Sequence, residues 1–377
     1  MSNVFITPEA IARDAAITLS NRLIVGNMVS RSHEALFADK VGDEVRVTVP
    51  PPVTDADEMT GSTSAGDAVE TEVAVKLEKW FYKRADLTSK NKSLEMHDFA
   101  RLITIPKVSG IADSIDKHFL KQMQVFRANL TGTVTNRPSS MAHVAAAQKT
   151  LTDLKLMKAG RLGLIDTTVH ASLSQLSNFQ SLDFGPDSAM NGREGELGRR
   201  YGFDWTNDSN LGAFSRSAAA GDITGTPLTV GTPAIGAVLI TIDGVTNATG
   251  TIYAGTAFTL AGDTTRYVVR KDITAVGNTY TNMSIFPALV AEPGDGAAVA
   301  FEAAGYSNLV YHPSAVTGAI VAPAPLSGGN SVIATHNGIT VRVSQDSSIT
   351  SLADSIVFDV FVGCRVIQPN GGALFCG

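Results

Sequence analysis

One stretch of the sequence departs from all the rest. Residues 222–304 hold 15 threonines and 10 glycines, with seven acidic against three basic residues. Short runs rich in valine, isoleucine and threonine lie at 238–242, 257–260 and 267–269, and turns that contain glycine separate them. No apolar stripe with helical period is present. This pattern predicts a small β-barrel or β-sandwich within a longer chain.

Two similar segments lie on either side of that stretch. Residues 162–165 and 309–311 each have the pattern of a short buried strand, and each is followed by a capping residue and a short helix pattern. Units of this kind assemble in one α/β layer even when a long excursion separates them. We therefore expect residues 138–220 and 305–362 to form one domain, with residues 221–304 inserted into it.

The N-terminal part begins with a helix and continues with strands. Thr7, Pro8 and Glu9 supply a capping hydroxyl, a proline for the first turn and an acid near the positive end of the helix dipole. The predicted helix ends near Gly26. Alternating valines then predict a strand over residues 41–49, and a second strand over 73–82, so that the two form a long hairpin.

The middle of the chain is predicted to be helical. A helical region opens at Ser93, and Pro106 should kink or restart it because proline lacks the amide donor. A rod of about 20 residues from Pro106 would span roughly 30 Å. A further helix follows Pro138, and the last strands, at 363–377, turn near Gln368.

Charge is segregated between two neighbouring segments. Residues 51–75 contain six acids and no lysine or arginine, whereas residues 76–92 contain six bases against two acids. Two surfaces of opposite charge would be complementary if copies of the chain sat side by side. The alternative is a solvated loop beside a solvated face. The residues concerned are Asp55, Asp57, Glu58, Asp67, Glu70 and Glu72, and then Lys76, Lys79, Lys83, Arg84, Lys90 and Lys92.

A second charged segment follows the glycines at 192, 195 and 198, which are spaced unlike a dinucleotide-binding loop. We expect a loop here. Arg193, Arg199 and Arg200 lie near three acids in the sequence, so these charges either contact a neighbouring copy or are solvated.

Signatures of catalysis and of metal binding are missing from the sequence. It has no phosphate-binding loop, no zinc-protease motif, no nucleophile elbow and no Cys-x-x-Cys pair. His312 and His336 could pair at a metal, but no cysteine or close carboxylate completes the site. Cys364 and Cys376 are expected to be buried free thiols in strands that pair. We therefore predict no enzyme activity, no cofactor and no metal.

Net charge and hydropathy disfavour nucleic acid and membranes as binding partners of this chain. Thirty basic against 36 acidic residues give a net charge of −6, which disfavours a surface that coats nucleic acid. The first seven residues lack the pattern of a signal peptide, and no run of about 18 apolar residues predicts a transmembrane helix. Membrane attachment is not expected.

The order of these parts resembles the major capsid proteins of tailed bacteriophages, with the α+β fold named after phage HK-ninety-seven. It resembles in particular the coat family of the P-twenty-two type, which carries an inserted β-domain. The closest stretches are AGTAFTLAGDTTRYVV, SIFPAL and GRRYGFDWTNDSNL. Mapped on this chain, the resemblance implies an N-terminal arm at 1–40, strands with an extended loop at 41–92, a spine helix and peripheral domain at 93–137, an axial domain at 138–220 and 305–362, an inserted domain at 221–304 and C-terminal strands at 363–377.

What the resemblance implies is a protein that forms shells. Hexamers and pentamers of the chain would build an icosahedral procapsid with a scaffolding protein and a portal, and a decoration protein could bind outside. The shell, assembled in the host cytoplasm, would expand as it encloses DNA and become the virion capsid. The contacts expected between subunits use Asp55, Asp57, Glu58, Asp67, Glu70, Lys79, Lys83, Arg84, Arg193, Arg199 and Arg200.

Two alternatives remain open at this point. A bacterial nanocompartment shell shares the fold but as a group lacks the insertion. An adhesin or carbohydrate-binding protein would explain the β-rich stretch, but it predicts secretion.

Overall fold

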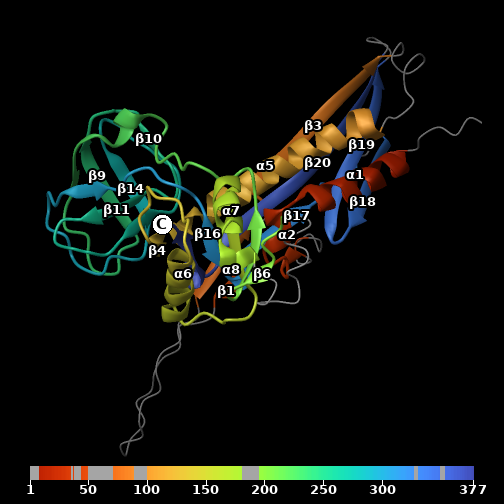
Figure 1. Ribbon diagram of the computed structural model, residues 1–377. Helices are drawn as coiled ribbons and strands as arrows, with labels where there is room; N and C mark the ends of the chain where they lie inside the picture. The colour runs from red at the N-terminus through yellow and green to blue at the C-terminus, as the bar shows by residue number, and fades with distance from the viewer. Residues whose placement is uncertain are drawn as a thin grey trace, which may run out of the picture. The chain divides into compact units, whose positions relative to one another are not determined.

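The computed structural model describes residues 8–34, 37, 44–49, 71–88, 100–180, 195–326, 330–348 and 353–377. The chain forms two compact units. Unit 1 comprises Met1–Phe119 and Val316–Ile367, and unit 2 comprises Leu120–Ala315 and Gln368–Gly377. The colours of Figure 1 follow the chain through both units.

Unit 1 is built on an antiparallel sheet of five strands. The order is β17-β20-β19-β18, and β3 pairs with the other edge of the long strand β20. The strands are β3 (Lys79–Thr88), β17 (Val316–Val321), β18 (Asn330–His336), β19 (Ile339–Ser348) and β20 (Ala353–Val366).

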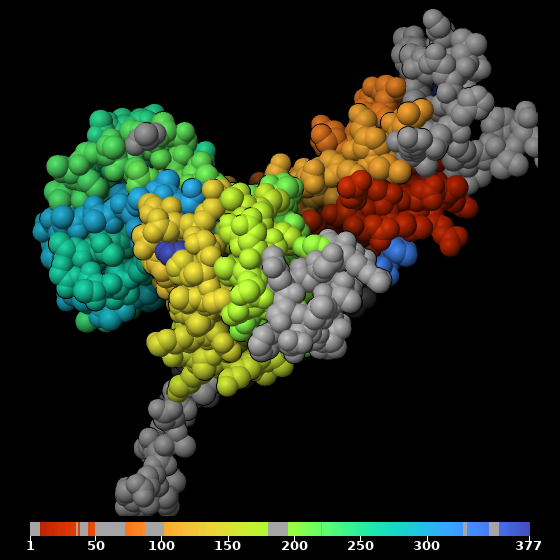
Figure 2. All heavy atoms as spheres, in the orientation of Figure 1, coloured from red at the N-terminus to blue at the C-terminus, as the bar shows by residue number. Residues whose placement is uncertain are grey.

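Helices α1 (Pro8–Arg22) and α5 (Ile105–Met123) lie along this sheet (Figure 1). The predicted first helix is confirmed, with Pro8 as its first residue, although it ends at Arg22 and a short α2 (Val25–Met28) follows. The face of α1 toward the sheet is buried, at Ile11, Ala12, Ala15, Ala16 and Leu19. In Figure 2 its opposite face, in red, lies at the surface. Helix α1 is thus part of the core of unit 1.

Pro106 lies in the first turn of α5, after a π-helical turn at Ala100–Thr104. The prediction that proline restarts the helix here is confirmed. Ser93, where the helical region was expected to open, lies outside the described residues.

The predicted hairpin is confirmed in part. Strands β1 (Glu44–Val49) and β2 (Thr71–Lys76) pair antiparallel, with Val45 opposite Val75. The extension into residues 79–82 is wrong, because these residues begin β3 and pair with β20. The chain crosses β20 closely at this point: a Cβ on Gly363 would lie 2.3 Å from the carbonyl oxygen of Lys76.

Unit 2 contains a second sheet of six strands, in the order β4-β21-β16-β5-β7-β6. β5 lies between antiparallel β16 and parallel β7. The two separated strand units therefore share one layer, as predicted. The strands are β4 (Leu130–Thr131), β5 (Arg161–Ile165), β6 (Arg199–Arg200), β7 (Phe203–Asn207), β16 (Leu309–Tyr311) and β21 (Gly372–Phe375), with helices α6 (Met141–Asp153), α7 (Thr167–Ser174) and α8 (Ser177–Gln180).

The expected partners of the C-terminal strands differ from those observed. After β16, a single 3₁₀ turn (Pro313–Ala315) leads into β17, where a helix was predicted, and residues 316–367 belong to unit 1. The grouping of 305–362 with 138–220 therefore holds only as far as Ala315. β21, which follows the 3₁₀ turn Pro369–Gly371, pairs with β16 and β4, so the final strands do not form a pair of their own.

The predicted β-rich stretch forms a six-stranded antiparallel sheet, in the order β15-β11-β12-β14-β9-β8. Its core contains Phe258, Tyr267, Tyr280 and Ile285, each fully buried. The strands are β8 (Gly225–Thr229), β9 (Leu239–Val245), β11 (Ala257–Leu260), β12 (Tyr267–Val269), β14 (Tyr280–Phe286) and β15 (Val299–Phe301); β10 (Thr251–Ile252) pairs with β13 (Ile273–Thr274), and a 3₁₀ turn (Ala220–Ile223) precedes β8.

Arg266, directly before β12, attaches this sheet to the 3₁₀ turn Gln124–Ala128, which follows α5 and contains Arg127. The buried Arg127 donates to the carbonyl of Tyr306 at 2.9 Å, and its guanidinium lies 4.1 Å from the ring centroid of Phe214. Arg266 donates to the carbonyl of Arg127 and pairs with Glu302. Burial lowers the pKa of Arg127 to about 10, so the group remains charged at neutral pH.

Candidate functional site

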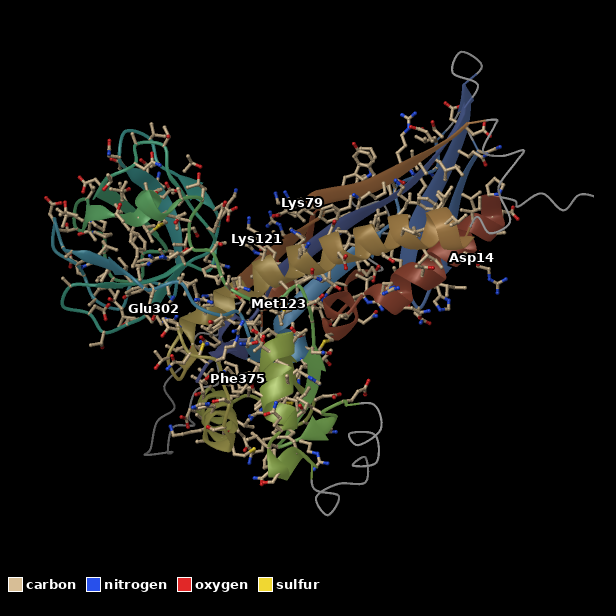
Figure 3. The ribbon with its side chains drawn as sticks, turned by 45° about the horizontal axis from the view of Figure 1, so that its top comes forward. Asp14, Lys79, Lys121, Met123, Glu302 and Phe375 are labelled. Carbon is tan, nitrogen blue, oxygen red and sulfur yellow. The ribbon has the colours of Figure 1, made fainter. Side chains whose placement is uncertain are left out.

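Three of the predicted contact residues, Lys79, Lys83 and Arg84, lie on β3, and the strand divides them between two faces. Side chains alternate along a strand. Lys83 passes beside Gly110 of α5, where an added Cβ would lie 3.4 Å from the lysine Cε. Phe81 faces the same helix, with its ring 6.3 Å from that of His118. Lys79 shares this register and begins the strand (Figure 3).

The other face of β3 carries Trp80, Tyr82, Arg84 and Asp86. Arg84 pairs with Asp86 at 2.6 Å and donates to the hydroxyl of Ser355 at 2.7 Å. Hydrogen bonds from Ser355 and Arg84 hold the pKa of Asp86 below its usual range. Arg84 is therefore already partnered within its own chain, which makes it a weaker candidate to bind an acidic segment of another copy.

Aromatic side chains dominate this open face, and the pattern of charge along the sequence gives no sign of them. Trp80 is 58% exposed and Tyr82 is 65% exposed. The indole of Trp80 is held in place: Nε1 donates to Asp359 at 3.0 Å, and the ring lies 5.3 Å from that of Phe361. Asp359 in turn pairs with the buried Arg342. The sequence signal that could have found this aromatic face is the period-two alternation through Trp80, Phe81 and Tyr82, which places Trp80 and Tyr82 on the same side of a strand.

The two described arginines of the second charged segment differ. Both form the short strand β6 against β7. Arg199 is exposed. Arg200 is only 9% exposed, and its carbonyl accepts the indole N–H of Trp205 at 3.1 Å. The side chain of Arg200 is thus largely buried within unit 2, which makes it a poor candidate for the predicted contact with a neighbouring copy.

The remaining predicted contact residues, Asp55, Asp57, Glu58, Asp67, Glu70 and Arg193, lie outside the described residues. In the neighbouring hairpin β1–β2, the charged side chains form ion pairs with one another. Lys76 pairs with Glu44 at 2.7 Å, and Arg46 lies 3.4 Å from Glu72. The hydrogen bond from Lys76 lowers the pKa of Glu44. Lys76 and Glu72 thus have partners within the same hairpin.

The described part of the chain offers no cluster of side chains for a metal ion. It holds no group of three or more histidines, cysteines or acids placed to bind a metal. His312 lies in unit 2 and His336 in unit 1. His312 is hydrogen bonded to Ser314 and to the carbonyl of Ala159. Both cysteines are buried free thiols, as predicted. Cys364 lies in β20 of the first sheet, whereas Cys376 directly follows β21 of the second sheet, so the expected pairing of their strands is wrong.

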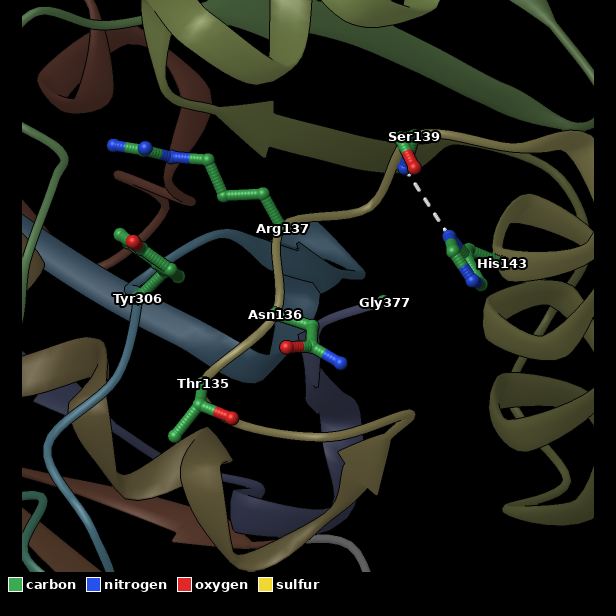
Figure 4. A pocket seen from close by; sticks show the side chains of 7 residues that line it. All are labelled: Thr135, Asn136, Arg137, Ser139, His143, Tyr306 and Gly377. Carbon is green, nitrogen blue, oxygen red and sulfur yellow. Dashed lines mark hydrogen bonds between the residues drawn. The ribbon is translucent and has the colours of Figure 1, made fainter.

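A pocket in unit 2 is lined by polar side chains, among them His143 and Arg137, which already have hydrogen-bond or ion-pair partners (Figure 4). His143 accepts a hydrogen bond from the Ser139 amide at 3.1 Å, so this imidazole is engaged by backbone. Arg137 pairs with Asp166 at 3.0 Å and stacks on Tyr306. These contacts stabilise loops of the unit. The lining residues are Thr135, Asn136, Arg137, Ser139, His143, Tyr306 and Gly377.

Among the described residues, no helix is long and apolar enough to cross a membrane.

The comparisons with known proteins address the fold. No family model matches this chain, and no curated protein matches it. Among solved structures, one titled Mycobacterium phage Che8 matches with a TM-score of 0.52 and 16% identity, over 94% of this chain and 90% of that chain. The capsid structure of Cyanophage P-SCSP1u matches with a TM-score of 0.46 and 13% identity, over 88% and 83%. The mature capsid of bacteriophage PhiM1 matches with a TM-score of 0.43 and 10% identity, over 88% and 81%.

The first of these likenesses shows a fold shared over nearly the whole chain. The chain is a mixed α and β protein with the HK-ninety-seven-type fold of tailed phages, as the resemblance predicts. The P-twenty-two subtype stays a prediction.

Proposed function

We propose that this chain is the major capsid protein of a tailed phage, whose copies form an icosahedral shell around the phage DNA. The observation that carries the proposal is the fold shared with the Mycobacterium phage Che8 structure over 94% of this chain. The open aromatic face of β3 supports it, because exposed aromatic side chains are typical of protein interfaces.

Assembly from hexamers and pentamers fits a chain with many modest contacts. A standard interface buries about 1,600 Å², and a subunit that touches several neighbours sums several such areas while each contact stays reversible. Misplaced subunits can then leave before the shell closes. A scaffolding protein, a portal and a decoration protein are proposed partners, with assembly in the host cytoplasm and later expansion around DNA.

Electron microscopy tests this function directly. The full chain is expressed alone and with the scaffolding protein encoded by the same phage, and the products are separated by sedimentation. Closed particles tens of nanometres across support the proposal. Monomers or small soluble oligomers in both preparations would overturn it.

The insertion of residues 221–304 is the basis for proposing the P-twenty-two subtype. Its strands are contiguous in the sequence and form one sheet with its own core. The bond from Arg266 to the carbonyl of Arg127 would tie such an insertion to the 3₁₀ turn that follows α5.

The proposed subunit contact brings the acidic segment of one copy to the cations of the next. With Arg84 paired and Arg200 buried, the remaining described candidates are Lys79, Lys83 and Arg199. Exposed ion pairs contribute only about 0.2 to 1 kcal/mol each, but they recur at every copy.

Reversal of three acids tests this contact. The triple variant Asp55→Lys, Asp57→Lys and Glu58→Lys should remain folded by circular dichroism and fail to form particles. The matched control, Asp55→Asn, Asp57→Asn and Glu58→Gln, removes charge without reversing it and should assemble more slowly. Normal particles from the reversed variant would end the idea.

A further inference from the structure

One edge of β17 is closed by groups that do not belong to a strand. β17 pairs with β20 along its other edge. On the closed edge, Ser30 donates its amide to the carbonyl of Val316 at 3.1 Å, and its carbonyl accepts the amide of Gly318 at 2.9 Å. The segment that follows α2 therefore begins to run along β17 as a strand would.

Further along the same edge, a side chain replaces the backbone. The amide of Ile320 donates to Oε1 of Glu34 at 3.3 Å. Beyond it, the amide of Ala322 donates to the hydroxyl of Thr340 at 2.7 Å. Unpaired amides on an edge strand can pair with a strand of another chain, and these hydrogen bonds prevent such pairing. Glu34 is the one ionisable group among these partners.

The carboxylate of Glu34 is incompletely compensated. Its Oε2 lies 3.8 Å from Nη1 of Arg31, which is too long for a hydrogen bond. That Nη1 is buried and has no hydrogen-bond partner, while Nη2 donates to the carbonyl of Asn337 at 3.0 Å. The side chains of Arg31 and Glu34 are 22% and 16% exposed. A charge is thus held away from water with one long hydrogen bond and one loose ion pair.

Burial consequently dominates the titration of this group. It raises the pKa of Glu34 to about 7, although Arg31 and the Ile320 amide act in the opposite direction. β17 contributes no charged residue to this environment. Titratable groups on the segments packed here include Asp116 of α5, which accepts the amides of Ile24 and Gly26. They also include His33, which is hydrogen bonded to Ser32, and His336 at the end of β18.

We propose that Glu34 is a proton-operated latch, which holds residues 30–34 on the edge of β17 when its carboxyl group is protonated and releases them more readily when it is ionised.

The sign and size follow from linkage. A buried acid whose pKa lies above its value of 4.5 in the open state binds its proton more tightly when latched. The ratio of latched to open chain is therefore highest below pH 4.5 and falls as the pH rises to about 7. Between pH 4.5 and about pH 7 the ratio of latched to open chain falls by up to about 300-fold, and above about pH 7 it is constant.

The latch joins two parts of unit 1. Toward the N-terminus, the segment continues into α2 and α1. Toward the C-terminus it leads to Phe37, which is buried with Val45, Val47 and Val75 of the hairpin. Opening would loosen the connection between the arm helix and the hairpin. If the proposed shell function holds, this gives the arm two states that proton concentration controls, but the latch itself is a property of one subunit.

Hydrogen exchange followed by mass spectrometry tests the latch on the full chain. Protection of a peptide that covers residues 316–322, corrected for intrinsic exchange, should fall steeply between pH 5 and pH 7 and level off by pH 8. A peptide from β19 serves as the internal reference. Constant protection across this range in the wild-type chain would overturn the proposal, whatever the chain assembles into.

Two variants separate the latch from general loosening. Glu34→Gln keeps an acceptor oxygen without a titrating group, so the protection of this peptide should lose its dependence on pH. Glu9→Gln removes an exposed acid from α1 and should leave the wild-type profile unchanged. The same pH profile in Glu34→Gln as in wild type would show that another group is responsible. If Glu34→Gln does not fold, a carboxyl carbon titration of Glu34 by NMR decides, since a midpoint near 4.5 contradicts the latch.

Discussion

Asp116 of α5 accepts the backbone amide of Gly26 on one carboxylate oxygen, at 2.9 Å. Its other oxygen accepts the amide of Ile24, also at 2.9 Å. The carboxylate is 2% exposed and satisfies two amides at the start of α2, the role that a capping residue usually fills from within its own helix. The arm is therefore fixed to the spine by a residue that lies 90 positions further along the chain.

Removal of this carboxylate should destabilise unit 1 strongly. Asp116→Ala leaves one buried and one partly buried backbone donor without their acceptor, so we expect a loss of about 3 kcal/mol in the free energy of unfolding. Urea denaturation measures it. Asp113→Ala, at an exposed site on the same helix, is the control and should change stability by less than about 0.5 kcal/mol. Equal effects of the two variants would contradict this role for Asp116.

Local elements of this fold could be predicted from the sequence, whereas long-range partners could not. Pro8 and Glu9 indicated where α1 starts, and the alternating valines indicated the hairpin β1–β2. The same alternation says which residues share a face and nothing about which strand lies beside them. For that reason β3 was assigned to the hairpin, while it pairs with β20, more than 250 residues away.

For the candidate contact surface, too, the sequence identifies residues but not their partners in the fold. Charge along the chain pointed to Lys79, Lys83 and Arg84, and all three lie on one strand. Their availability depends on tertiary partners: Arg84 has Asp86 and Ser355, and Lys83 lies against α5. A run of charges in a sequence gives no information on such pairing.

Gly163 tests the packing of the second sheet. Its position in β5 lies opposite Trp205 of β7, and a Cβ there would come within 2.4 Å of the indole ring. Phe375 and the carbonyl of Arg200 hold that ring in place. Gly163→Ala should therefore destabilise unit 2 by about 3 kcal/mol, as overpacking does.

A double-mutant cycle identifies the cause. Adding Trp205→Leu to Gly163→Ala should recover part of the loss, because the smaller side chain leaves room for the methyl group. Gly212→Ala, where an added Cβ meets nothing within 4 Å, is the neutral control. Strictly additive effects of the first two changes would show that the indole is not the obstacle. Thermal unfolding followed by calorimetry measures the four chains of the cycle and the control.

Asp222 should make the inserted sheet sensitive to acid. Burial raises the pKa of its carboxyl group, but hydrogen bonds from Ala219, Thr251 and Asn247 outweigh burial and hold the pKa below 3.8. Such a group stabilises the fold fully above the unfolded-state pKa and loses this contribution as the pH falls through the lower folded-state value. Stability should thus decline with acid below about pH 4.

Asp222→Asn separates this effect from general acid unfolding. The variant should be less stable than wild type by about 1 to 3 kcal/mol at pH 7, since the amide cannot accept all the same bonds. The difference should shrink toward pH 2, where the wild-type carboxyl group has gained its proton. Urea titrations at several pH values measure the difference in the free energy of unfolding between the two chains. A difference that does not change with pH would refute the role of the Asp222 carboxylate in this acid sensitivity.

Tyr82 tests whether the open face of β3 forms a contact between subunits. The side chain is 65% exposed, so Tyr82→Ala should leave the unfolding temperature of the subunit nearly unchanged. An aromatic residue at the centre of an interface contributes about 2 kcal/mol, so the critical concentration for assembly should rise roughly 30-fold. Light scattering against protein concentration measures it. Met157→Ala, at a residue of unit 2 that is 67% exposed, is the control and should assemble as wild type. Unchanged assembly of Tyr82→Ala would place the subunit contact on another surface, because an aromatic ring that is buried by a neighbour cannot be removed without cost.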